Sequence, residues 1–269
     1  MNNAILKRFS VYSGIKARTF MRDSFFSLCG GNECLRCGSK KGLLCKQCEN
    51  SFTNDFSKIS ALRCSVCGKE LISESETCLS CRENPILKSI EKAFPIYPYR
   101  MWNKKLLLDW KIKGERSLSP IFAKTVHNAL KSTGFPSVIV PIPPRPLKIF
   151  LNGWDQVQEL AYFLNTLYGY KVLKLLKRNS REQQKKKNRE GRLLTTEGSY
   201  SLSKNALEFA KKNKVPNSVV LLDDIMTTGA TIECCARLLK RLGIRKVYAL
   251  SLKQFKSRSR DLARDLRQL

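Results

Sequence analysis

Long apolar stretches are missing from this sequence. It contains no run of about 18 apolar residues, which argues against a membrane-spanning helix. Residues 1–28 also lack the continuous apolar core and the small-residue cleavage site of a secretory signal. We therefore expect a cytoplasmic protein. The same segment mixes basic and scattered apolar residues, so a peripheral contact with the inner membrane stays open beside simple packing on its own domain.

Acidic residues and histidine are scarce. Fifty Lys and Arg stand against 22 Asp and Glu, which gives a formal net charge of +28 and a pI near 9.9. Such an excess attracts polyanions, including nucleic acid, anionic lipid and phosphorylated small molecules, although a generally solvated surface is the alternative explanation. The single histidine, His127, lies in a predicted helix, where we expect it to have no catalytic role.

Cysteine, by contrast, is abundant, with 11 residues. Gly38 and Gly68 follow two of the cysteine pairs and permit tight turns whose N–H groups face bound sulfurs. Four thiolates from two turns suit one tetrahedral Zn²⁺, so the spacing predicts two structural zinc sites. Interleaved pairing and a single zinc stay open, whereas disulfides would need an oxidising compartment. The ligands form four C-x-x-C pairs: Cys34 and Cys37, Cys45 and Cys48, Cys64 and Cys67, Cys78 and Cys81.

The stretch from Val219 to Leu242 is the clearest candidate for a ligand site. Four apolar residues predict a buried parallel strand, the carboxylates Asp223 and Asp224 follow, and a short loop leads into a predicted helix. Ligands bind outside the carboxyl ends of such strands, and a helix start offers N–H groups to phosphate. Because vicinal hydroxyls suit the acidic pair, the stretch predicts a ribose 5-phosphate site; a plain helix cap would explain only one Asp and one Thr. The loop residues are Thr227, Thr228, Gly229, Ala230 and Thr231.

Strands alternate with helices over residues 85–256, which predicts an α/β domain with a doubly wound, mostly parallel sheet. An edge strand is expected at 94–99, because its two prolines exclude a central position. The other predicted parts are a basic N-terminal segment at 1–28, a double zinc-ribbon domain at 29–84 and a charged C-terminal helix or tail at 257–269. The remaining strands are expected at 137–143, 170–176, 218–223 and 246–252.

The acidic pair and the T-T-G-x-T loop together resemble the PRPP-binding motif of type I phosphoribosyltransferases. This resemblance implies that fold, with Asp223 and Asp224 as catalytic residues that hold the ribose hydroxyls while the loop wraps the 5-phosphate. A wider pattern is similar to the ComF family, which is linked to DNA uptake in naturally competent bacteria. It covers about residues 34–253 and includes the cysteine pairs, Trp110–Gly114, Val140–Pro143 and Asn152–Gln156.

A long basic segment interrupts the α/β pattern between Leu176 and Ser201. Segments of this kind are usually functional lids or disordered excursions. The resemblance to phosphoribosyltransferases implies a hood over the substrate here, in which Arg178 and Arg192 stabilise the departing pyrophosphate. A solvated charge run and a nucleic-acid patch are the alternatives.

The resemblance implies an enzyme that binds PRPP with Mg²⁺ and transfers the phosphoribosyl group to an unidentified acceptor. Lys111 and Arg145 would bind the pyrophosphate. The alternative is a non-catalytic competence factor that binds single-stranded DNA or uptake proteins, with PRPP as a ligand. The positive charge favours this alternative, and the scarcity of regular aromatic and basic interleaving weakens it.

Overall fold

A computed structural model describes residues 33–54, 63–71, 74–97, 101–145, 148–149, 153–179, 198–212 and 215–254, apart from the side chains of 101–104 and 254. Three predictions concern residues outside these ranges: the N-terminal segment at 1–28, the C-terminal tail at 257–269 and the hood residue Arg192. The chain divides into two compact units, Met1–Thr53 and Asn54–Leu269. The first contains the first four paired cysteines and most of α2 (Lys46–Asn54). The predicted domain boundaries stay predictions.

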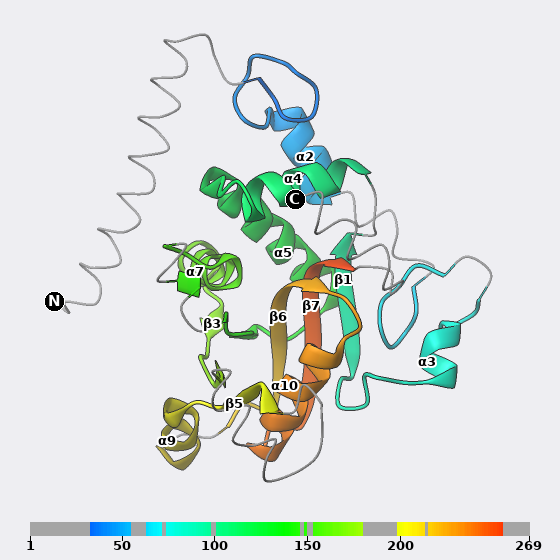
Figure 1. The fold of residues 1–269 in the computed structure, drawn as a ribbon, viewed down its shortest axis with the longest axis vertical. Helices are drawn as coiled ribbons and strands as arrows, with labels where there is room; N and C mark the ends of the chain where they lie inside the picture. Colours follow the sequence, from blue (N-terminus) through cyan, green and yellow to red (C-terminus); the bar gives the residue numbers. More distant parts are fainter. Residues whose placement is uncertain are drawn as a thin grey trace, which may run out of the picture. The chain divides into compact units, whose positions relative to one another are not determined.

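The larger unit contains a five-stranded parallel sheet with the strand order β1-β7-β6-β2-β3. Figure 1 shows β6 and β7 side by side, with β1 next to β7. This sheet confirms the expected α/β class. The edge position of β1 fits the two-proline argument, because its Pro95 cannot donate a ladder hydrogen bond. The strands are β1 (Lys92–Tyr97), β2 (Val138–Pro141), β3 (Lys171–Val172), β6 (Ser218–Met226) and β7 (Lys246–Gln254).

Strand β6 is longer than the sequence predicts. It continues past Asp223 to Met226, because β7 pairs with it over its whole length, up to the pair Met226 and Gln254. On its other side β6 pairs with β2 only as far as Leu222. The acidic pair therefore lies in the part of the strand where one neighbour has ended.

Helices cover the sheet through apolar faces. In α10 the buried Ile232, Cys235 and Leu239 recur at helical spacing and pack with Val219 and Leu221 of β6. Burying such an aliphatic side chain stabilises the fold by about 1.5–3 kcal/mol. The helical elements of this unit after the second cysteine cluster are α4 (Met101–Lys111), η2 (Arg116–Leu118), α5 (Ser119–Thr133), α7 (Gln156–Tyr168), α9 (Lys204–Lys212) and α10 (Ala230–Arg241).

The strand predicted at 170–176 is split in two. Only Lys171 and Val172 pair with β2, whereas β4 (Leu176–Arg178) leaves the sheet and pairs antiparallel with β5 (Tyr200–Leu202). The polar Asn179 stabilises this separate ribbon. It is buried, donates to the Gly198 carbonyl at 2.8 Å and accepts from the Ser201 hydroxyl at 2.9 Å.

The second cysteine cluster lies in the same unit as the sheet, and Figure 1 shows its α3 (Leu79–Glu83) on the β1 side. The backbone N–H of Ala93 in β1 donates to the Val66 carbonyl at 2.8 Å. Val66 and Cys67 pack against both the small cysteine core and the core of the sheet. The cluster thus covers part of the otherwise open edge of β1.

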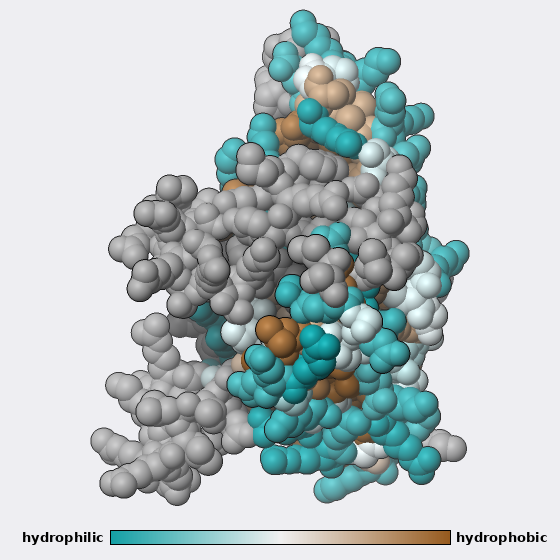
Figure 2. Space-filling model, turned by 90° about the vertical axis from the view of Figure 1, so that its right-hand side faces the viewer, coloured by the Kyte–Doolittle hydropathy of each residue, from teal (hydrophilic) through white to brown (hydrophobic). Residues whose placement is uncertain are grey.

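No helix in the described ranges has both the length and the apolar character needed to cross a bilayer. The described surface seen in Figure 2 is mainly hydrophilic, with small and separate apolar patches.

Candidate functional site

The acidic pair lies at the carboxyl end of the central strands. Asp223 and Asp224 are both partly buried, and the Asp224 N–H donates to Asp223 Oδ1 at 2.9 Å. β6 occupies a middle position in the sheet, so this end of the strand is where α/β proteins bind ligands.

The loop after β6 combines exposed threonine side chains with the start of a helix. Thr227 and Thr228 are exposed, and the Ala230 N–H donates to Thr228 Oγ1 at 3.3 Å. Gly229 has a φ of 88°, which favours glycine, and its Cα faces the Leu87 side chain. The loop therefore presents hydroxyl groups and helix N–H groups at one place, which suits an anion.

Lys111 is brought to the acidic pair from α4. Its Nζ lies 2.6 Å from Asp224 Oδ2, and the two side chains are 31% and 16% exposed. The end of α4 is held in place because the buried Trp110 donates from Nε1 to Ser119 Oγ at 2.8 Å. Gln156 adds a bond from Nε2 to the Lys111 carbonyl at 3.0 Å. Of the predicted cations, Lys111 is thus in direct contact with the predicted site.

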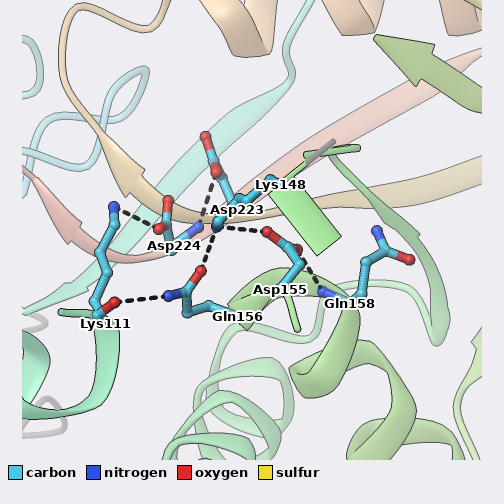
Figure 3. A network of polar contacts seen from close by, with 7 residues as sticks. All are labelled: Lys111, Lys148, Asp155, Gln156, Gln158, Asp223 and Asp224. Atoms are coloured by element: carbon cyan, nitrogen blue, oxygen red, sulfur yellow. Dashed lines mark hydrogen bonds and ion pairs between the residues drawn. The ribbon is translucent and has the colours of Figure 1, made fainter. Parts of the chain in front are cut away.

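A second cation, Lys148, was not predicted. Its Nζ lies 2.7 Å from Asp155 Oδ2 and also donates to Gln156 Oε1, and Figure 3 shows it beside the acidic pair. Asp155 caps α7 by accepting from the Gln158 N–H at 3.0 Å. The exposed Arg145, which was predicted to bind pyrophosphate, is absent from the network of described residues in Figure 3. The only sign of Lys148 in the sequence is its place in the basic turn after β2.

The two carboxylates have opposite electrostatic environments. Burial and the charge of Asp224 raise the pKa of Asp223 well above its ordinary value. Burial also disfavours the charged form of Asp224, but the Lys111 ammonium outweighs it, so the pKa of Asp224 is lowered; Lys148 adds to this effect. The pair therefore combines one stable carboxylate with one that ionises reluctantly and would gain from hydroxyl donors or a cation.

Arg178 approaches the loop through an aromatic neighbour. Its guanidinium lies 5.3 Å from the ring centroid of Tyr200, its partner in the β4–β5 ribbon. Burial raises the pKa of Tyr200 to about 12, although Arg178 and a hydrogen bond with Thr231 partly oppose the shift. Tyr200 therefore links Arg178, at the base of the predicted hood, to Thr231 of the loop.

The eight paired cysteines form two separate clusters, and the four Sγ atoms of each lie within 4.8 Å of one another. Consecutive C-x-x-C pairs share a cluster, so the interleaved arrangement does not occur. The N–H of Cys45 points to Cys34 Sγ at 3.4 Å, and that of Cys78 to Cys64 Sγ at 3.3 Å. The glycine after each first pair has a positive φ, as expected. The clusters are Cys34, Cys37, Cys45 and Cys48, and Cys64, Cys67, Cys78 and Cys81.

The chemistry of these clusters fits a structural zinc ion. In the second cluster burial disfavours the Cys64 thiolate, but backbone N–H groups outweigh burial and lower its pKa to about 7. Burial, together with the neighbouring thiolates, raises the pKa of Cys67 to about 12. Four adjacent thiolates therefore need a cation to stay charged together, and Zn²⁺ would supply that charge.

Comparison with known proteins gives three relatives. Competence protein ComFC of Streptococcus pneumoniae is 29% identical over 214 residues, which cover 78% of this chain and 86% of that protein. Competence protein ComFC of Bacillus subtilis is 26% identical, covering 75% of this chain and 90% of that protein. Competence protein F of Haemophilus influenzae is 24% identical, covering 70% of this chain and 83% of that protein. No model of a protein family matches the chain.

The fold and its side chains define an α/β protein with a mostly parallel sheet, an acidic pair near the carboxyl end of a central strand and two four-cysteine clusters. Within that class, the chain is similar over most of its length to the ComF family of competence proteins.

Proposed function

We propose that this protein binds PRPP with Mg²⁺ on a type I phosphoribosyltransferase fold, transfers the phosphoribosyl group to an unidentified acceptor and has a role in DNA uptake. The observation that carries the proposal is the joining of Asp223 and Asp224 to an open threonine loop at the start of α10, with Lys111 alongside. The names of the three relatives support the link to competence.

The proposed ligand matches the site group by group. The acidic pair accepts hydrogen bonds from the vicinal ribose hydroxyls, and the loop from Thr227 to Thr231 binds the 5-phosphate through N–H and hydroxyl groups. The pyrophosphate needs further positive charge, which Lys111 and Lys148 supply from two different elements. When the ligand binds, Lys111 exchanges its contact with Asp224 for one with pyrophosphate oxygen.

In the proposed transfer, the bond from ribose C1 to the pyrophosphate oxygen breaks and its electron pair leaves with pyrophosphate. A lone pair of the acceptor, an amine or a base, forms the new bond to C1, and the acceptor proton passes to solvent. The carboxylates of Asp223 and Asp224 stabilise the positive charge that develops on the ribose, and the lysines stabilise the leaving group. Mg²⁺, when bound, neutralises pyrophosphate charge.

A calorimetric titration with PRPP and Mg²⁺ tests this proposal. We expect binding by the wild-type protein, and a loss of at least tenfold in affinity in the double variant Asp223→Ala/Asp224→Ala. Lys111→Met should also weaken PRPP binding, because it removes the cation beside Asp224. Lys113→Met is its matched control, because Lys113 is exposed and pairs with Asp109 instead. The absence of wild-type binding at millimolar PRPP would refute the proposal.

The net charge of +28 supports the second candidate, a binding protein for single-stranded DNA or uptake proteins. A gel-shift series with single-stranded DNA at increasing salt separates the two. A salt-dependent shift that survives the double variant, in a protein that does not bind PRPP, would favour this second function.

A further inference from the structure

The segment that leads from the second cysteine cluster to β1 contacts the loop at the start of α10. Leu87 of this segment is buried against Gly229, and a Cβ added to Gly229 would lie 3.0 Å from Leu87 Cδ2. The linker thus packs directly against the backbone of the predicted phosphate loop.

Glu233 ties the same linker to the first turn of α10. Its side chain is buried, and Oε2 accepts from the N–H groups of Lys88 and Ser89, both at 2.9 Å. Oε1 accepts from the Ser89 hydroxyl at 2.8 Å. Its own N–H donates to the Gly229 carbonyl at 2.9 Å, so the carboxylate is rigidly connected to the loop. Charge-assisted bonds of this kind are about twice as strong as neutral ones.

The other end of the linker is held by the cluster itself. Besides the bond from Ala93 to Val66, Arg63 donates to the carbonyls of Pro95 at 2.5 Å and Ile96 at 3.2 Å. Gly68 packs against β1 so closely that a Cβ would lie 2.4 Å from the Ala93 carbonyl oxygen. A continuous chain of contacts therefore runs from the cysteines through β1 and the linker to the loop.

We propose that Glu233 is a positioning residue through which the second cysteine cluster holds the loop from Thr227 to Thr231 in its ligand-binding conformation. Metal occupancy at this cluster and phosphate binding at the loop then stabilise each other, because coupling between two sites is reciprocal. The phosphate half of this coupling rests on the proposed function. The mechanical half, the ordering of the loop, does not.

Hydrogen–deuterium exchange of the full-length, zinc-loaded protein tests the mechanical half without any ligand. In Glu233→Ala, which leaves the N–H groups of Lys88 and Ser89 without their acceptor, we expect amides of residues 227–233 to exchange about tenfold faster. Glu233→Gln, which keeps an acceptor, should restore most of the protection. Glu91→Ala is the matched control, because Glu91 lies in the same linker and pairs with Lys240 at the far end of α10, 3.2 Å away. Equal exchange in Glu233→Ala and Glu91→Ala would overturn the proposal.

A second comparison separates the two clusters. Cys81→Ser and Cys37→Ser each remove one of the less buried ligands, from the second and the first cluster respectively. We expect faster exchange at 227–233 in Cys81→Ser only. If Cys81→Ser does not fold, Ser89→Ala replaces it and should give an intermediate increase. Equal effects of the variants in the two clusters, or no effect of Ser89→Ala, would contradict the assignment.

Zinc release to a chromogenic chelator tests the phosphate half of the coupling. PRPP should slow release from one of two zinc ions in the wild type, and not in Glu233→Ala. If calorimetry shows that the wild type does not bind PRPP, the proposed function fails while the exchange result still decides the mechanical half. If PRPP binds and zinc release is unchanged, the coupling fails alone.

Discussion

Asp223 and Asp224 are neighbours in the sequence, yet their surroundings give them different properties. Lys111 lowers the pKa of Asp224 against the effect of burial, while burial and the adjacent charge raise that of Asp223. The difference follows from contacts with an element more than a hundred residues away, so no inspection of the motif could assign it. In the ligand-free protein, the charged form of Asp223 therefore destabilises the fold, whereas the charged form of Asp224 stabilises it.

Substitution of each aspartate by asparagine should change stability in opposite directions. Because the folded-state pKa of Asp223 is raised, ionisation above the unfolded value of about 4 destabilises the fold, and Asp223→Asn should be more stable than wild type at neutral pH. The folded-state pKa of Asp224 is lowered, so its charged form stabilises the fold. Asp224→Asn should therefore lower the free energy of unfolding by about 1 kcal/mol at neutral pH, because the substitution removes the ion pair with Lys111.

Urea denaturation at a series of pH values measures both effects. The gain in Asp223→Asn should shrink as pH falls towards about 4, and the loss in Asp224→Asn should disappear below that pH as the wild-type carboxylate is protonated. If both variants changed the free energy of unfolding in the same direction, the assignment of Asp224 as the carboxylate stabilised by Lys111 would be wrong.

Lys148 shows where residue-level prediction from sequence reaches its limit. Arg145 and Lys148 are both basic residues of the same turn after β2, and nothing in their spacing distinguishes them. The structure selects Lys148, because Asp155 and Gln156 at the start of α7 receive its ammonium group.

The second cysteine cluster and β1 behave as one structural element. The tight turn at Gly68 lies against β1, whereas the equivalent Gly38 of the first cluster has no atom within 4 Å of an added Cβ. Both glycines have positive φ, of 67° and 72°. The glycine that follows the first C-x-x-C pair is therefore tightly packed in the second cluster and unpacked in the first.

Alanine at these two glycines gives a matched test. Gly38→Ala should cost only about 1 kcal/mol of left-handed backbone strain, whereas Gly68→Ala adds a clash with the Ala93 carbonyl and should lose roughly a further 1–3 kcal/mol. Thermal unfolding of the sheet, followed by circular dichroism, should show a lower Tm for Gly68→Ala alone. An equal shift for Gly38→Ala would mean that the packing of Gly68 on β1 contributes nothing to stability.

For the whole chain, the two clusters predict a metal content of two zinc ions per molecule. The first cluster lies in the small unit at Met1–Thr53, and the second is packed on the sheet. Elemental analysis combined with native mass spectrometry should find about two equivalents. Iron, or no metal together with oxidised thiols, would contradict this prediction.

Removal of both zinc ions by a chelator should lower the Tm of the sheet, because loss of the second cluster uncovers the β1 edge. Cys37→Ser, which affects the first cluster only, should leave the Tm of the sheet unchanged. A sheet whose melting is insensitive to the chelator would show that the second cluster does not support β1.

Local sequence was sufficient to predict the two cysteine clusters and the alternation of strands and helices, and to place the acidic pair and its loop between a strand and a helix. Each depends on spacing within a few residues, or on apolar periodicity within one element. Element ends were predicted less well: β6 runs past Asp223 and the strand at 170–176 is split, because pairing with a neighbouring strand decides where a strand stops.

Tertiary structure alone decided which cations reach the acidic pair and what holds the loop. Lys111 meets Asp224 from the end of α4, which Trp110 and Gln156 help to hold, and Ser89 meets Glu233 across 144 positions of sequence. Such contacts depend on how packed elements approach one another, and no local periodicity encodes that approach. The sequence therefore specified the chemical groups of the site, and the packing of distant elements determined their partners and their charge.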